Sequence, residues 1–200
     1  MNRLILASDN AHKYREFCEI LSGTDTLVIK RSEAGCDFDV EENGTSFAEN
    51  AYIKAKSVTD HTHTPAVSDD SGICVDHLGG GPGIYSARYG AGIAHDDHER
   101  MMHLLDEMKD ATDRSAHYVC SICCTFPNGD VLTAEDICEG TILYEPVGSG
   151  GFGYDPIFRP DGYDRSMAQL TPEEKNSISH RGKALRKFLE LYKRYLDAHK

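Results

Sequence analysis

The sequence predicts a mixed α/β fold, and two observations lead to this prediction. In the first third of the chain, short apolar runs alternate with segments whose apolar residues recur at the spacing of a helix. Further on, residues 115–145 contain two strand-like segments around Asn128-Gly129, a dipeptide that strongly favours a hairpin turn. Strands that alternate with helices pair in parallel, whereas a hairpin is antiparallel, so we expect a mixed sheet flanked by helices.

The first elements are a strand, a tight turn and a helix. The apolar run 3–8 is followed by the segment 9–23, in which apolar residues lie at helical spacing up to Gly23. Residues 26–30 are typical of a second strand, and residues 45–60 of a second helix. The apolar faces of the two helices consist of Tyr14, Phe17, Cys18, Leu21, Phe47, Ala51, Ala55 and Val58.

The remaining elements continue the pattern. Residues 65–70 and 72–76 are typical of two short strands around a turn, and residues 94–110 of a helix. After the hairpin comes the glycine-rich stretch 147–162, and the chain ends in a helical segment. The stretch Thr171–Glu174 opens this segment, because a capping box and a proline at the first helical position mark a helix start.

Length and composition indicate a soluble globular protein over residues 1–200, either one domain or two closely associated lobes. The 200 residues suffice to bury a core, and 40% of them are hydrophobic and 27% charged. No apolar run approaches the roughly 18 residues of a membrane span, and the N-terminal run is too short for the core of a signal peptide. We therefore expect a cytoplasmic protein with no membrane partner.

The charge of the chain restricts its ligands. A formal net charge of −12 argues against a nucleic-acid-binding protein, which needs a basic surface to neutralise phosphates. A small anionic ligand remains compatible with this charge if cations converge locally or a metal ion bridges.

The seven cysteines fit a reduced, cytosolic protein, because their number is odd and the chain is too long for a disulfide scaffold. Cys120 and Cys123 form a CxxC pair, but no second pair lies at zinc-finger spacing. Their segment has the pattern of a strand, in which cysteine behaves as a small hydrophobic residue. A structural zinc site is therefore disfavoured.

Polar residues cluster where the predicted elements begin and end. The turn after the first strand lies at a helix N-terminus, which favours anions, and Lys13 adds a positive charge on the first turn. Many such turns bind nothing, so the pattern alone leaves phosphate binding open. Lys54 follows Asn50 by four residues and shares its helix face, although a solvated lysine would explain the spacing equally well.

Two carboxylate pairs are candidate metal ligands. Asp69 and Asp70 end a predicted strand, where adjacent carboxylates either form a turn or hold magnesium. Glu41 and Glu42 precede an Asn-Gly turn, and a solvated turn would also account for them.

Near the C-terminus, an amphipathic helix alone would explain the charges of Lys175, His180 and Arg181.

Five segments together resemble a known family. The segments SDNAHKYREF, ENGTSFAENAYIKA, SDDSGICVDHLGGGPGIYSARY, GSGGFGYDPIF and LTPEEKNSISHRGKAL follow one another in this order. They are similar to the signature blocks of the noncanonical purine NTP pyrophosphatases, the inosine/xanthosine triphosphate pyrophosphatase (ITPase) family. The resemblance runs from residue 3 to about residue 190, and its last two blocks are highly specific.

The resemblance implies a fold, an activity and partners. The expected fold is a two-lobed mixed β-sheet flanked by helices, with the nucleotide cleft between the lobes. The expected activity is hydrolysis of ITP, dITP and XTP to the monophosphate and pyrophosphate, which cleanses the nucleotide pool. Magnesium (Mg2+) is the expected cofactor, and a homodimer is the expected assembly.

The resemblance also assigns roles at the phosphate end of the nucleotide. Glu42 and Asp70 match metal carboxylates, and Asp70 is also the expected acceptor of the attacking water's proton. Lys54 matches a triphosphate contact. Asp9 departs from the family, which usually has glycine there, so its side chain either points away from the phosphates or caps the helix. The expected phosphate turn comprises Ser8, Asp9, Asn10, Ala11, His12 and Lys13, of which Ser8, Asn10 and Lys13 match the motif directly.

At the other end of the nucleotide, the resemblance implies contacts to the sugar and base. A glycine-rich loop can wrap closely around a nucleoside, and an aromatic ring offers a stacking face. Phe152 or Tyr154 would stack, Asp155 would accept a hydrogen bond, and Ser71 would contact substrate. The expected contacts are Ser71, Phe152, Gly153, Tyr154, Asp155, Lys175, His180 and Arg181.

Three other functions remain open at the level of the sequence. The nearest is a Maf-like pyrophosphatase for modified pyrimidine or methylated nucleotides, against which the Ser-His-Arg stretch 179–181 argues. A catalytically silent nucleotide sensor is disfavoured because both metal carboxylates and the lysines are present. A structural metal-binding protein built on the cysteines is the weakest of the three.

Overall fold

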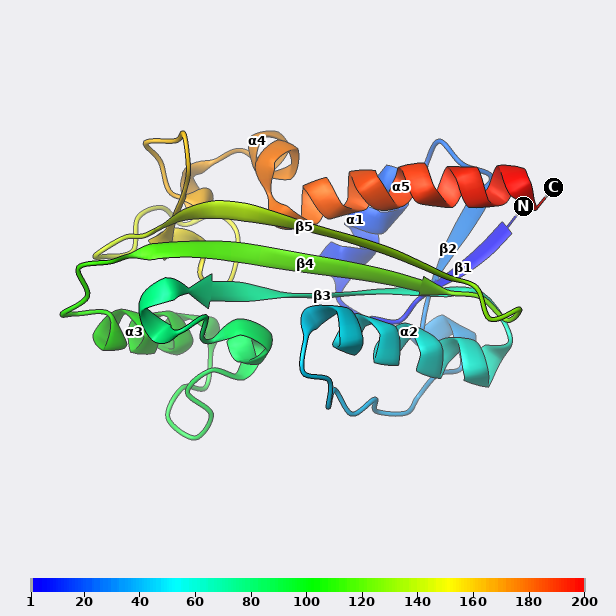
Figure 1. Cartoon of the computed structure of the whole chain (residues 1–200), viewed down its shortest axis with the longest axis horizontal. Helices are drawn as coiled ribbons and strands as arrows, with labels where there is room; N and C mark the ends of the chain where they lie inside the picture. Colours follow the sequence, from blue (N-terminus) through cyan, green and yellow to red (C-terminus); the bar gives the residue numbers. More distant parts are fainter. Residues whose placement is uncertain (1, 200) are drawn as a thin grey trace. The chain divides into compact units, whose positions relative to one another are not determined.

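The computed structural model describes residues 2–199 and contains a six-stranded mixed sheet in the order β2-β1-β3-β4-β5-β6 (Figure 1). β1 pairs in parallel with both β2 and β3, whereas β5 and β6 are antiparallel. The predicted mixed sheet and the hairpin at Asn128-Gly129, which joins β4 to β5, are thereby confirmed. The strands are β1 (Asn2–Leu6), β2 (Thr26–Lys30), β3 (Ala66–Val75), β4 (Ser115–Thr125), β5 (Val131–Ile142) and β6 (Phe158–Pro160).

The helices begin close to the residues that their sequence signals indicate. Asn10 caps the first helix, Ser46 the second and Thr171 the fourth, each with a side-chain oxygen that accepts a backbone N–H. The helices are α1 (Ala11–Leu21), α2 (Phe47–Thr62), α3 (Asp97–Glu107), α4 (Pro172–Ile178) and α5 (His180–Ala198).

The chain forms two compact units. The first comprises Met1–Asp70, Cys120–Glu135 and Ala184–Lys200, and the second comprises Ser71–Val119 and Asp136–Lys183. The division falls within β3, β4 and β5, so each of these strands contributes residues to both units.

In the first unit, β1 places alternate side chains on opposite faces of the sheet. Leu4 and Leu6 join an apolar cluster with residues of α1 and α5, whereas Ile5 joins a second cluster with Val58 of α2. Figure 1 shows α1 and α5 on one face of the sheet around β1, and α2 on the other face. Because both faces are covered, residues 4–6 of this strand form a continuous apolar run rather than an alternating one.

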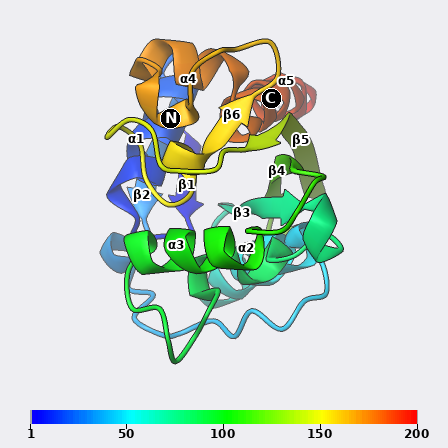
Figure 2. The ribbon, with the colours of Figure 1, turned by 90° about the vertical axis from the view of Figure 1, so that its left-hand side faces the viewer.

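In the second unit, one apolar cluster connects α3 to the strands. Met101 and Leu104 of α3 belong to it together with Ile73, Tyr118 and Phe158. Figure 2 shows α3 on one side of these strands and α4 on the other. The glycine-rich loop precedes β6 and is therefore anchored on the edge of the sheet.

The prediction of two short strands around a turn at Asp69 and Asp70 is wrong. The structure has one strand, β3, that continues through both carboxylates. Both are buried, and each forms an ion pair with a lysine, Lys13 for Asp69 and Lys54 for Asp70. Paired in this way, the carboxylates do not need the solvent exposure that a turn would provide.

The C-terminal helical segment divides in two. Ser179 has an extended backbone and ends α4, and its hydroxyl accepts the Gly182 N–H at 3.1 Å in the first turn of α5. The division places His180 and Arg181 in the first turn of a new helix. At Gly182 a Cβ atom would lie 1.9 Å from the carbonyl oxygen of Asn176, so only glycine permits this close approach.

We therefore expect Gly182→Ala to destabilise the protein. The added methyl group forces the Asn176 carbonyl and the start of α5 apart, and overpacking of this kind costs about 3 kcal/mol. For a chain of this length the melting temperature falls by roughly 6–12 °C. Gly23→Ala is the matched control, since no atom lies within 4 Å of its added Cβ. Equal melting temperatures of the two variants would contradict the steric argument.

Candidate functional site

The turn between β1 and α1 is built by its own side chains. Asn10 Oδ1 accepts the backbone N–H of His12 at 2.9 Å and that of Lys13 at 3.2 Å, while the N–H of Asn10 donates to Ser8 Oγ at 3.2 Å. These bonds hold the predicted phosphate turn at the positive end of the helix dipole.

Asp9 lies in this turn, but its side chain does not cap the helix. Its carboxylate accepts the Ser32 N–H at 3.3 Å and lies 3.6 Å from Arg31 Nε. Of the two sequence-based possibilities, the helix cap is therefore wrong, because Asn10 caps α1. Arg31 also offsets the additional negative charge.

Lys13 reaches from the first turn of α1 to β3. Its ammonium lies 3.0 Å from Asp69 Oδ1 and 3.4 Å from the Asp69 carbonyl oxygen. The Asp69 side chain is fully buried, whereas that of Lys13 is partly exposed. Asp69 therefore holds Lys13 in place beside the turn.

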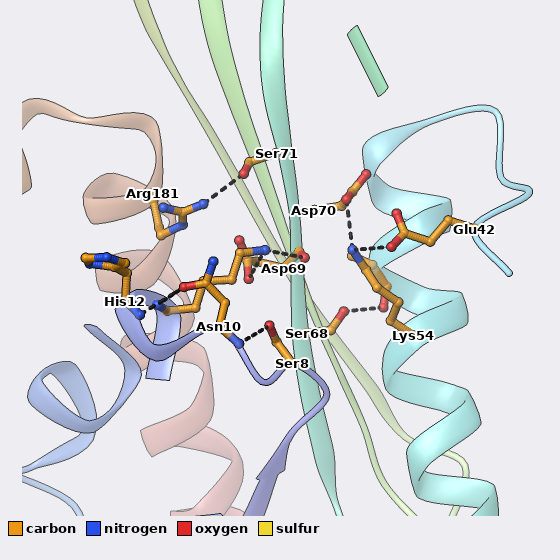
Figure 3. A network of polar contacts seen from close by, with 12 residues as sticks. Ser8, Asn10, His12, Glu42, Lys54, Ser68, Asp69, Asp70, Ser71 and Arg181 are labelled. Carbon is orange, nitrogen blue, oxygen red and sulfur yellow. Dashed lines mark hydrogen bonds and ion pairs between the residues drawn. The ribbon is translucent and has the colours of Figure 1, made fainter. Parts of the chain in front are cut away.

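The next residue of β3, Asp70, faces the opposite side of the strand. Figure 3 shows it turned toward Lys54 and Glu42, while Asp69 lies on the other side. Lys54 Nζ lies 2.8 Å from Asp70 Oδ1 and 3.5 Å from Glu42 Oε1. A single ammonium thus bridges the two carboxylates that the sequence suggested as metal ligands.

Burial and neighbouring charges shift the pKa values of Lys54 and Asp70 in opposite directions. Burial lowers the pKa of Lys54, but the attraction of Asp70 and Glu42 outweighs it, so the lysine stays protonated. Burial raises the pKa of Asp70, and Lys54 offsets this only in part.

Asn50 is a site residue to which the sequence analysis gave no role. It is fully buried, and its Nδ2 donates to Asp70 Oδ2 at 3.3 Å while its Oδ1 accepts the Gly44 N–H at 2.9 Å. Asn50 therefore connects Asp70 to the segment that carries Glu42. The available signal was an asparagine on the apolar face of a helix, one turn before Lys54.

In the second unit, Asp155 organises the glycine-rich loop. Its Oδ2 accepts the Phe152 N–H at 2.8 Å and the Lys175 ammonium at 2.5 Å, and the residue is 4% exposed. At Gly151, whose φ is +73°, a Cβ atom would lie 2.1 Å from the same oxygen. The loop needs glycine there because the carboxylate lies directly against its backbone.

The two aromatic residues of the loop have different environments. Tyr154 is buried, and its hydroxyl donates to the Ser86 carbonyl at 2.8 Å. Phe152 is 47% exposed, with Lys175 Nζ 4.6 Å from its ring centroid and Arg181 5.8 Å away. Of the two rings, Phe152 is the one that can stack on a ligand.

The first turn of α5 carries the two remaining candidates. Arg181 is buried and donates from Nη2 to Ser71 Oγ at 2.9 Å. The His180 ring stacks on Tyr118, with centroids 4.6 Å apart and an angle of 7° between the planes. Tyr118, a buried residue of β4 that the sequence analysis did not select, therefore orients His180.

Other parts of the molecule are less suited to the expected chemistry. A pocket of about 910 Å³ in the first unit is lined by residues that include Arg3, His63 and Tyr192, and by none of the predicted site residues. All seven cysteines are thiols, and burial raises the pKa of Cys123 to about 12 and that of Cys138 to about 11.

Two further features bear on a membrane location and on metal binding. Within residues 2–199, no helix is both long and apolar enough to span a membrane. Over the same residues, His, Cys, Asp and Glu side chains form no cluster of three or more that could hold a metal ion. Glu42 and Asp70 form a pair, which is the number of carboxylates that Mg2+ commonly takes from a protein when phosphates supply further ligands.

Comparisons with known proteins identify the family of the chain and agree with its fold. The dITP/XTP pyrophosphatase of Treponema denticola is 45% identical over 185 residues, which cover 92% of this chain and 94% of that protein. That of Streptomyces coelicolor is 44% identical over 203 residues, covering 98% and 100%. A solved HAM1 protein structure from Coxiella burnetii has a TM-score of 0.92 and 39% identity, and covers 97% of this chain and 100% of that one. Residues 4–191 match the model of the Ham1 family, and the chain belongs to this family.

Proposed function

We propose that the protein hydrolyses the noncanonical purine nucleotides ITP, dITP and XTP to the monophosphate and pyrophosphate, and thereby cleanses the nucleotide pool. The observation that carries the proposal is the pair of lysines, Lys13 in the first turn of α1 and Lys54 on α2, which are held by neighbouring carboxylates of β3. The relatives named dITP/XTP pyrophosphatases support it.

The cofactor in this proposal is Mg2+, and the donor set suits it. Glu42 and Asp70 offer hard carboxylate oxygens, the ligands that Mg2+ prefers, and a cation already lies between them in the form of the Lys54 ammonium. When bound, Mg2+ neutralises charge on the phosphate oxygens and acidifies bound water.

Different residues of the chain have different roles in the proposed reaction. Water attacks the α-phosphorus and pyrophosphate leaves, a reaction that depends on alignment and charge stabilisation more than on covalent catalysis. Asp70 accepts the proton of the attacking water. Lys13 and Lys54 stabilise the charge that develops on the leaving pyrophosphate.

The residues of the second unit are assigned to the nucleoside. Phe152 stacks on the base, and Arg181 donates a hydrogen bond to the oxygen at position 6 of the purine. Ser71 contacts substrate beside Arg181. Asp155 acts as a positioning residue, because its carboxylate is already engaged by the loop and by Lys175. The same proposal includes contacts from Gly153, Tyr154, Lys175 and His180, and from the turn residues Ser8, Asp9, Asn10, Ala11 and His12.

The proposed oligomeric state and cellular compartment rest on the resemblance to the ITPase family. We propose a homodimer of single two-lobed domains in the cytoplasm, where the free nucleotide pool is found. Light scattering of the purified protein measures its mass in solution, and a monomer at working concentration would contradict the dimer.

Pyrophosphate release from a panel of nucleotides tests the function. With Mg2+, we expect ITP, dITP and XTP to be hydrolysed with much higher kcat/KM than GTP and ATP. A preference for modified pyrimidine or methylated nucleotides would favour a Maf-like enzyme instead. Tight binding of ITP without turnover would favour a nucleotide sensor.

Lys13→Ala should weaken binding of the triphosphate far more than binding of inosine. Hydrogen bonds to charged groups contribute about 1.5–3 kcal/mol, which corresponds to roughly 10- to 150-fold in affinity. Calorimetric titration with a nonhydrolysable α,β-methylene analogue of ITP measures the loss. The matched control is Lys109→Ala, which removes an exposed lysine of the second unit. Equal losses for nucleoside and nucleotide would contradict the assignment of Lys13 to phosphate.

A further inference from the structure

Lys54 contacts the same two carboxylates that the proposed function gives to the metal. Its ammonium lies 2.8 Å from Asp70 Oδ1 and 3.5 Å from Glu42 Oε1 (Figure 3). The same lysine is assigned to the triphosphate. One ammonium cannot serve the carboxylates and the phosphates at full strength at the same time, so its partner must change when substrate and metal arrive.

We propose that Lys54 is a built-in placeholder for the metal ion, an inference that rests on the proposed function. In the nucleotide-free protein its ammonium neutralises one of the two negative charges of Glu42 and Asp70. A divalent cation that binds these carboxylates displaces the ammonium, which then turns to the triphosphate. Metal and nucleotide thus favour each other's binding through this one side chain.

The surroundings of Lys54 permit this exchange. Asn50 Nδ2 donates to the second oxygen of Asp70, and Asn50 Oδ1 accepts the Gly44 N–H. Both bonds are independent of Lys54, so the carboxylate keeps its orientation when the ammonium leaves. The lysine charge sits on a flexible four-carbon chain, which can reorient while α2 stays in place.

The placeholder has a thermodynamic consequence. If the triphosphate withdraws Lys54 from the carboxylates, it tightens metal binding, and by linkage the metal tightens triphosphate binding by the same factor. In the absence of nucleotide, the lysine competes with the metal. The carboxylates therefore stay occupied, and a metal ion without nucleotide binds weakly.

The test measures Mn2+ binding to the nucleotide-free full-length protein by electron paramagnetic resonance. Lys54→Met removes the competing ammonium but keeps the length of the side chain, and we expect it to tighten Mn2+ binding by about tenfold or more. Lys56→Met is the matched control, because Lys56 lies on the same helix, pairs with the exposed Asp60 and carries the same charge. It should leave the Mn2+ affinity within about twofold of wild type.

Thermal unfolding provides a second readout that does not depend on activity. Without metal, Lys54→Met leaves buried Asp70 without its ammonium and should melt below wild type. Saturating Mn2+ should then raise its melting temperature by more than it raises that of wild type, because a tighter ligand stabilises more. If Lys54→Met does not fold, Lys54→Gln is measured in its place.

Equal Mn2+ affinities of wild type and the Lys54 variant would overturn the placeholder, as would an equal gain in Lys56→Met. If the affinities of wild type and the Lys54 variant are equal, loss of Mn2+ binding in Glu42→Gln would still support Glu42 as a metal ligand. No Mn2+ binding by either protein would also overturn it, since removal of the competitor would have uncovered no site. A Lys54 variant that binds Mn2+ more tightly, in a protein that hydrolyses no purine triphosphate, would support the placeholder and refute the proposed function.

Discussion

Asp70→Asn is expected to lower the turnover of ITP by about two orders of magnitude or more, which is within the range for removal of a general base. An amide has nearly the same shape as the carboxylate but cannot accept the proton of the attacking water. The substitution also disturbs the polar network. If the amide oxygen of the new residue faces Lys54, its NH2 group faces the Nδ2 of Asn50, and two donors meet.

Steady-state kinetics with varied ITP and saturating Mg2+ measure the loss, and they report kcat and KM separately. Asp69→Asn is the matched control, because Asp69 is the neighbouring buried carboxylate and also pairs with a lysine, but it takes no part in the proposed proton transfer. We expect less than a tenfold loss of turnover in the control, with the larger effect on KM through Lys13. If Asp70→Asn kept more than a tenth of wild-type turnover, Asp70 would not be the base.

Arg181→Ala is expected to collapse the preference for ITP over ATP. Hypoxanthine presents an acceptor oxygen at position 6, whereas adenine presents an amino group there, and a guanidinium can only donate. A well-placed arginine contact to a purine O6 edge discriminates by about 1–3 kcal/mol, or roughly 5- to 150-fold. Arg181 is buried, and Ser71 Oγ accepts from its Nη2, so its orientation is set before a base arrives.

The measured quantity is kcat/KM for ITP, XTP and ATP. We expect a strong fall for the first two and little change in the slow ATP rate. Arg165→Ala serves as the control, since Arg165 is an arginine of the same unit that pairs with Glu174 near the surface. Proportional losses for ITP and ATP would mean that Arg181 holds phosphate or structure, and the base would then be read by the backbone.

The mixed sheet could be predicted because its signals are local. Apolar spacing, the Asn128-Gly129 turn and the capping box at Thr171 each lie within a few residues of the element that they specify. The course of β3 through Asp69 and Asp70 could not be predicted in this way. Their lysine partners lie 56 and 16 residues away, and only the folded chain brings them together.

The candidate site shows the same division between local and distant signals. Sequence motifs indicated candidate segments for the site, but not which side chains of a loop face its interior. Tyr154 and Asp155 carry polar groups that a nucleoside could use, yet those groups are engaged by Ser86, Lys175 and the loop backbone. Asn50 had no motif of its own, because its role depends on the position of Asp70.

The alternation of side chains along β3 determines where the chain can tolerate insertions and deletions. Ser68 and Asp70 face α2, and Asp69 faces Lys13, so a one-residue insertion or deletion in the strand would exchange the two faces. Asp70 would then turn away from Lys54 and Glu42, and the proposed base and metal ligand would be lost in one step. Deletions in β3 should therefore abolish activity, whereas the exposed stretch 91–93 before α3 can accept added residues.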